Sequence, residues 1–130
     1  MSARALAAGS LALLVGAGAP LAHAQGGDAV KGRQLFESRC VGCHSLDQNR
    51  VGPALGTVAG RTAGKAPGYT YSPAMAQATH VWTGDQLRAW LTDPEALVPG
   101  QAMGYSLSQA DDRRDVVAFL QSLAQARPAQ

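Results

Sequence analysis

Five consecutive residues, Cys40-Val41-Gly42-Cys43-His44, constrain this chain more than any other segment. Two thiols three residues apart can add across the two vinyl groups of one porphyrin, and the adjacent imidazole can then reach the iron from one side of the ring. On a helical turn, Cys40, Cys43 and His44 stand at i, i+3 and i+4 and share one face. The spacing therefore predicts one haem c, attached through Cys40 and Cys43, with His44 as an iron ligand.

Other uses of a cysteine pair explain this segment less well. An exported chain can form a plain disulfide. A thioredoxin-like redox pair requires a β-α-β pattern nearby, which the sequence lacks. A zinc site requires four ligands, and there is no second Cys/His pair. Only haem attachment uses the adjoining His44.

The first 24 residues have the features of a secretory signal peptide. Arg4 provides a short positive segment, Leu6 to Val15 is apolar, and Ala22-His23-Ala24 matches a small-x-small cleavage site. We expect cleavage after Ala24, which removes residues 1–24 and leaves 25–130 as a single domain in the periplasm. An uncleaved membrane anchor is the alternative, but the apolar run is short and is followed by glycine and proline.

Composition excludes several classes of protein. Charged residues make up 15% of the chain and the net charge is +2, without a run of lysine or arginine, so nucleic-acid binding has no electrostatic footprint. Both cysteines lie in the haem-attachment segment, which leaves none for a structural disulfide. A domain of this size buries a thin core, to which a haem would add a large apolar surface.

Capping residues and apolar spacing predict an all-α fold of about four helices joined by long loops. Each expected helix begins at a residue that can cap it, with proline or an acidic residue often following. The expected segments begin at Asp28 (running towards Cys43), at Ser72 (Pro73 to Ala78), at Thr83 (ending at Asp93) and at Ser108 (ending near Arg127). We expect a loop from Glu95 to Leu107, and no strands.

A second axial ligand must come from the few remaining soft or nitrogen donors. Electron carriers commonly pair histidine with methionine on the iron. Met103 lies in a Pro/Gly-containing loop that can lie over a haem face, whereas Met75 lies in a short helix, where methionine is more often a core residue. His80 is expected to be a solvated loop residue, and His23 leaves with the signal peptide. Met103 is therefore the predicted ligand.

Taken together, these motifs resemble the class I cytochrome c family over about residues 28–124. The resemblance implies a small cytochrome c fold, with helices and long loops wrapped around one covalently bound haem and with the first helix crossing the last. Besides the haem-attachment segment, the matching positions are Gly32-x-x-x-Phe36, Val51-Gly52-Pro53, Gly60-Arg61-x-x-Gly64-x-x-x-Gly68-Tyr69-x-Tyr71, Trp82, Leu91, Pro99-Gly100-x-x-Met103 and the Val116/Phe119 stripe.

The same resemblance implies roles for individual residues. His44 and Met103 would be the axial ligands, and the carbonyl of Pro53 would accept the other ring N–H of His44. A cation and two neutral donors would bind a haem propionate, a carboxylate that is otherwise costly to bury. These three residues are Arg61, Tyr71 and Trp82.

Three positions depart from the family pattern. Trp90 stands where tyrosine is common, Gln101 where threonine is common, and Ala102 where lysine is common. The first two change the hydrogen bonding expected near Met103. Because Lys31 and Lys65 are the only lysines, we expect docking to partners to depend less on salt than in lysine-rich members.

The resemblance implies a soluble periplasmic one-electron carrier that cycles between Fe(II) and Fe(III), has no catalytic residue and is not an enzyme. We expect a monomer without a stable membrane span after signal cleavage. The implied redox partners are a quinol-oxidising complex, a dehydrogenase, an oxidase or a peroxidase. One alternative is the haem subunit of a periplasmic dehydrogenase complex. Another is a haem enzyme or gas sensor with an open distal site, but the sequence has no obvious distal His/Arg pair.

Overall fold

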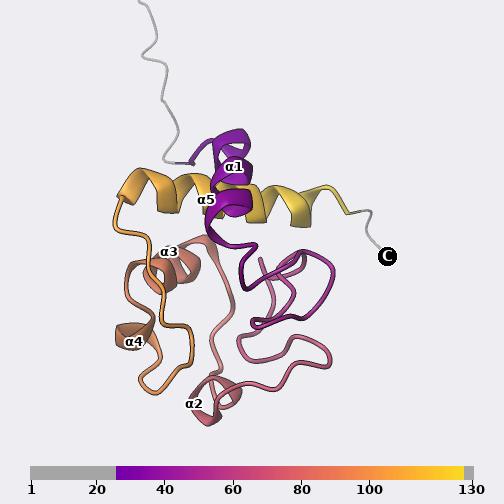
Figure 1. The fold of residues 1–130 in the computed structure, drawn as a ribbon, viewed down its shortest axis with the longest axis vertical. Coiled ribbons are helices and arrows are strands. Elements are labelled where there is room, and N and C mark those ends of the chain that lie inside the picture. The colour runs from indigo at the N-terminus through magenta and orange to yellow at the C-terminus, as the bar shows by residue number, and fades with distance from the viewer. Residues whose placement is uncertain (1–25, 128–130) are drawn as a thin grey trace, which may run out of the picture.

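A computed structural model describes residues 26–127, so the predicted signal peptide and its cleavage site lie outside the described residues. Within this range the chain forms five helices and no strands, in agreement with the all-α prediction. In Figure 1, α5 runs along the upper side of the molecule and α1 crosses it. The long loops that follow α1 lie below α5, on the right of the view. The helices are α1 Ala29–Arg39, α2 Pro73–Ala76, α3 Gly84–Thr92, α4 Pro94–Leu97 and α5 Ala110–Gln125. No helix among residues 26–127 is long and apolar enough to cross a membrane.

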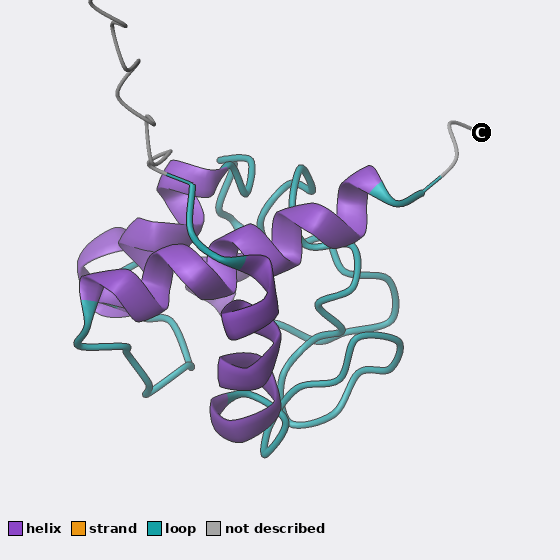
Figure 2. Cartoon of the chain, turned by 90° about the horizontal axis from the view of Figure 1, so that it is seen from above, coloured by secondary structure: helices purple, strands orange, loops and turns teal. Residues whose placement is uncertain are grey.

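The crossing of α1 and α5 depends on a glycine. A Cβ atom at Gly32 would lie 1.8 Å from the carbonyl oxygen of Asp115, so only glycine permits this approach. One turn later, the rings of Phe36 and Phe119 pack at 5.6 Å. Figure 2 shows the two helices crossing when they are seen from above. The predicted packing of the first helix on the last is confirmed.

Most of the predicted caps are present. The Asp28 carboxylate accepts from the backbone N–H groups of Val30 and Lys31 at 2.8 and 3.1 Å and begins α1. Ser72 Oγ accepts from Met75 N at 3.3 Å and begins α2, with Pro73 in its first turn.

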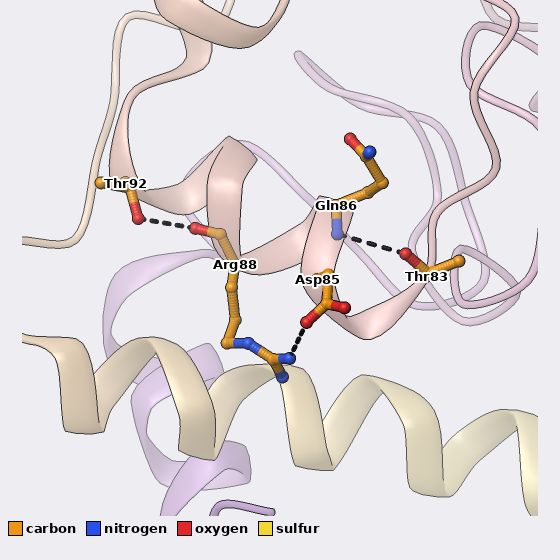
Figure 3. Close-up of polar contacts among 5 residues, drawn as sticks. All are labelled: Thr83, Asp85, Gln86, Arg88 and Thr92. Carbon is orange, nitrogen blue, oxygen red and sulfur yellow. Dashed lines mark hydrogen bonds and ion pairs between the residues drawn. The ribbon is translucent and has the colours of Figure 1, made fainter. Parts of the chain in front are cut away.

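Thr83 and Gln86, which have the spacing of a capping box, form only half of one at the start of α3. Thr83 Oγ1 accepts from Gln86 N at 3.2 Å, as Figure 3 shows, but Gln86 Oε1 is buried without a partner in residues 26–127. The reciprocal bond is missing because the Thr83 N–H donates to Val81 O at 2.7 Å. The same figure shows the ion pair between Asp85 and Arg88, whose side chains are 89% and 37% exposed.

Two expectations about the second half of the chain are wrong. The segment from Glu95 to Leu107 is not entirely a loop, because Asp93 Oδ1 accepts from Ala96 N at 3.1 Å and starts the single turn of α4. Ser108 does not cap the last helix. That helix follows Gln109, whose side chain makes no capping bond, while the Ser108 carbonyl accepts from Arg113 Nη1 at 2.9 Å.

The core lies between these helices and the loops. Val116 and Val117 on α5 are each 1% exposed, and α3 contributes Leu87 and Leu91. The loop between α1 and α2 adds buried residues of its own, including Val58 and Ala63. This long loop is therefore part of the packed structure and can hold a binding site.

Candidate haem-binding site

The haem-attachment segment continues the last turn of α1. Cys40 is the C-cap residue, and its carbonyl accepts from the backbone N–H groups of Cys43 and His44 at 3.1 and 2.9 Å. The tight turn brings both thiols and the imidazole close to the end of one helix. Among the described residues neither cysteine is in a disulfide, and Cys40 is half-buried while Cys43 is exposed, so both sulfur atoms remain for thioether bonds to a haem.

The His44 ring is held in one orientation. Its Nδ1 lies 2.8 Å from the carbonyl oxygen of Pro53, and because a carbonyl can only accept, Nδ1 carries the proton. The lone pair is then on Nε2, the nitrogen left to bind a metal. The buried Gly52 lies against the ring, since a Cβ atom there would be 2.2 Å from His44 Cε1. Close contact with Gly52 and a fixed tautomer suit a histidine that serves as an axial iron ligand.

The segment that carries Gly52 and Pro53 is itself fixed by side chains. The Tyr69 hydroxyl donates to Val51 O at 2.6 Å, and Arg50 Nη1 donates to Val41 O at 2.7 Å. In addition, Gly52 N donates to Cys43 O at 2.8 Å. A role for Arg50 and Tyr69 in placing His44 could not be predicted from local sequence, because their partners Val41 and Val51 lie 9 and 18 residues away.

Two of the three predicted propionate ligands, Arg61 and Trp82, lie on segments that pair side by side. Trp82 N donates to Arg61 O at 2.9 Å, and an antiparallel bridge joins the neighbouring residues Thr62 and Val81. Tyr71 is close enough to Arg61 to affect its pKa. The structure therefore brings Arg61 close to both Trp82 and Tyr71, although they are distant in the sequence.

The Nε–H of Arg61 remains available as a donor for a ligand. Nη1 donates to Thr57 Oγ1 at 2.8 Å and Nη2 donates to Ala54 O at 3.2 Å, but Nε is buried without a partner among the described residues. Burial lowers the pKa of the guanidinium, and the nearby Tyr71 opposes this shift. Since an arginine side chain stays charged in proteins, the buried, unpartnered N–H of this half-buried cation fits a carboxylate such as a haem propionate.

His80 lies in a different environment from the one expected. It is half-buried, its Nε2 is buried without a partner within residues 26–127, and its ring packs edge-on against Trp82 at 4.6 Å. Burial lowers the pKa of the imidazole. Trp82 in turn packs against Trp90 at 5.4 Å. The expectation of a solvated loop residue was wrong because the paired segment that buries His80 has no periodic sequence signal.

The two candidate methionines lie in contrasting places. Met75 is 6% exposed and belongs to the packed core. Met103 is half-buried on the loop between α4 and α5, beside a hollow of about 410 Å³ whose lining includes Glu95, Gln101 and Tyr105. A core methionine is surrounded by apolar side chains, whereas a methionine on a loop can turn towards a ligand.

These residues fit a haem rather than a bare metal ion. The described part of the chain has no group of three or more His, Cys, Asp or Glu side chains that could coordinate a metal. An iron at His44 would therefore need a porphyrin for its equatorial ligands. The close contact of Gly52 with the His44 ring and the unpartnered Arg61 Nε suit such a group. Fold and site together define a small, all-helical domain that carries one covalently bound haem.

Comparison with known proteins places this domain in a family. The family model described as cytochrome c matches residues 29–124. The chain is 43% identical over 100 residues to cytochrome c of Euglena viridis, covering 75% of this chain and 98% of the relative. It is 43% identical over 101 residues to cytochrome c2 of Rhodopila globiformis, covering 75% and 94%. The structure of cytochrome cH from Methylobacterium extorquens superimposes with a TM-score of 0.70 at 37% identity, covering 74% of this chain and 99% of that one.

The chain therefore belongs to the cytochrome c family. Its cofactor is haem c, bound covalently through the two cysteines of the C-x-x-C-H segment, Cys40 and Cys43. Members of this family carry electrons, and the chain is an electron carrier rather than an enzyme. These findings confirm the family, fold class and cofactor predicted from the sequence.

Proposed function

We propose that this protein is a soluble, monomeric, periplasmic one-electron carrier whose haem iron is ligated by His44 and Met103. The observation that carries the proposal is the His44 ring, which is fixed by Pro53 and Gly52 with Nε2 free to bind iron. The cofactor supplies the Fe(II)/Fe(III) couple. The predicted signal segment, residues 1–24, supports export.

Each residue of the site contributes a separate property to the carrier. Donation from Nδ1 of His44 to the Pro53 carbonyl makes Nε2 more basic and fixes the ring plane. The thioether of Met103 is a soft ligand that favours Fe(II) and so raises the reduction potential. Arg61, Tyr71 and Trp82 would bind a propionate and keep it ionised.

The exposed part of the attachment segment is the surface where partners would dock. Cys43 is exposed there, and Val41 is 40% exposed. Arg39 and Arg50 lie next to this segment and give it a small basic rim. We propose that a quinol-oxidising complex, a dehydrogenase, an oxidase or a peroxidase exchanges electrons at this surface.

The absorption spectrum of the ferric holoprotein tests the proposed ligation. Replacement of Met103 by Ala should abolish the methionine–iron band and allow carbon monoxide to bind the reduced protein, whereas Met75→Ala should retain the band and lower stability by about 2–5 kcal/mol. Ready binding of carbon monoxide to the wild type would refute the closed, six-coordinate site. Loss of the band in Met75→Ala but not in Met103→Ala would assign the iron ligand to Met75.

A further inference from the structure

We propose that Glu95 and Gln101 are positioning residues that hold the Met103 loop in place, and that they thereby set how often Met103 leaves the iron. This inference rests on the proposed function, because it takes Met103 as the iron ligand. It assigns a role to a carboxylate and an amide that the ligand set itself does not use. The two side chains are called the Glu95–Gln101 bridge below.

The bridge joins α4 to the backbone of the ligand loop. Glu95 Oε1 accepts from Gly100 N at 2.8 Å, and Oε2 accepts from Gln101 Nε2 at 3.3 Å. The other end of the same amide, Gln101 Oε1, accepts from the backbone N–H of Met103. Both oxygens of one carboxylate are therefore used on this loop, and the chain of bonds ends at Met103.

The Glu95 end of the bridge is held in place by α4. Glu95 lies in the first turn of α4, where Pro94 is buried and Asp93 caps the turn. Because α4 follows α3 directly, the carboxylate is attached to the helical core. Hydrogen bonds from backbone N–H groups to a carboxylate are stronger than those between neutral groups. An anchored carboxylate can therefore restrain a loop.

Near Met103 the backbone of the loop makes two hydrogen bonds of its own, from Gln101 N to Val98 O at 3.1 Å and from Tyr105 N to Met103 O at 2.9 Å. Its ends are packed, since Val98 and Leu107 are 7% and 5% exposed. Between them Gly100 has a φ of 87°, a left-handed conformation that glycine adopts readily, and regular secondary structure is absent from residues 98–109. Neither backbone bond ties this loop to α4, whereas the side-chain bonds of Glu95 and Gln101 do.

Weakening the bridge should raise the fraction of molecules in which the sixth coordination position is open. An added ligand such as imidazole binds only that open fraction, so its apparent dissociation constant falls in proportion as the fraction rises. Loss of the hydrogen bonds to the Glu95 carboxylate should change the equilibrium between the Met103-bound and the open state by about tenfold.

Imidazole titration of the ferric holoprotein, followed by the loss of the methionine–iron band, tests the bridge. Glu95→Ala and Gln101→Ala should each bind imidazole about tenfold more tightly than the wild type. The Glu95→Gln variant keeps an acceptor for Gly100 N and should show a smaller change. The matched control is Glu37→Ala, which removes another exposed glutamate, one paired with Arg33 on α1, and should leave imidazole binding unchanged.

The double variant Glu95→Ala/Gln101→Ala tests whether the two residues act as one unit. Since both bonds belong to one chain of contacts, we expect the double variant to bind imidazole much less tightly than the product of the two single effects predicts. Wild-type affinity in both single variants, or fully multiplicative effects, would overturn the inference. Hydrogen exchange should speed up at the Gly100 and Met103 amides while α5 is unchanged; equal acceleration throughout the chain would indicate general loss of stability instead.

A parallel titration of Met103→Ala separates this inference from the proposed function. If Met103→Ala does not bind imidazole more tightly than the wild type, Met103 is not the ligand and the proposed ligation fails. If Met103→Ala binds tightly while Glu95→Ala and Gln101→Ala behave as the wild type, the ligation stands and only the bridge is refuted.

Discussion

Replacement of Gly52 by alanine should disturb the His44 side of the haem site. Gly52 does not have a positive φ, so an alanine there is not strained by its own backbone. The added Cβ atom would instead lie 2.2 Å from Cε1 and 2.6 Å from Nδ1 of the His44 ring. Ordinary contact begins at 3.4 Å, so the ring or the Gly52 backbone must move by about 1.2 Å.

The expected cost follows from two contributions. Overpacking of a site that cannot relax freely costs roughly 1–3 kcal/mol. Movement of the ring also weakens the bond between Nδ1 of His44 and the Pro53 carbonyl, now 2.8 Å long, which costs about 1 kcal/mol more. We therefore expect Gly52→Ala to lower the free energy of unfolding by roughly 2–4 kcal/mol.

Guanidinium unfolding of the holoprotein, followed by haem absorbance, measures this change. The matched control is Gly42→Ala, because Gly42 is exposed in the same part of the chain and a Cβ atom there meets nothing within 4 Å. The control should stay within about 0.5 kcal/mol of the wild type. Equal midpoints for the two variants would refute the argument that Gly52 is required by the His44 ring.

Three further predictions concern packing, pH and partner docking. Gly32→Ala would place a Cβ atom 1.8 Å from Asp115 O and 2.9 Å from Phe119 Cβ, so urea unfolding should show a loss of roughly 1–3 kcal/mol despite the better helix propensity of alanine. Because burial holds the pKa of His80 below its ordinary value, the folded state binds fewer protons than the unfolded chain, and the free energy of unfolding should fall as pH decreases below about 6.5. The His80→Gln variant should show a smaller fall when unfolding midpoints at about pH 7.5 and about pH 5 are compared. An equal fall in the variant and the wild type would contradict this prediction. The rate of oxidation by a partner should decline only weakly with ionic strength, and a steep decline in stopped-flow measurements would show that docking is mainly electrostatic.

Features that depend on short-range chemistry could be predicted from the sequence. The caps at Asp28, Ser72 and Thr83 use side chains that bond to backbone two or three residues away, so local sequence was enough. The one-turn helix α4 was missed because four residues show no periodicity. Its only signal, Asp93-Pro94, is also the signal that ends α3.

Contacts across the chain could not be predicted from the local sequence. The pairing that brings Arg61 beside Trp82 joins backbone groups 21 positions apart, and it leaves no pattern in either segment. The resemblance to a family named Arg61 and Trp82, but it could not show that Nε of Arg61 has no partner among the described residues or that the half-buried His80 packs against Trp82. In the same way, Gln101 was recognised only as an unusual residue, and its bond to the Met103 backbone required the fold.

The two sides of the haem site are restrained to different extents. On the His44 side, a buried glycine and a carbonyl contact the ring directly, and Arg50 and Tyr69 fix the surrounding backbone. On the Met103 side, the restraint passes through the exposed Glu95 on one turn of helix and the half-buried Gln101 on the loop. Bonds exposed to water contribute less than buried ones because water competes for the same groups. In the proposed ligation, the methionine side should therefore open at the lower cost, and changes in its bridging residues should alter ligand binding while the histidine side stays intact.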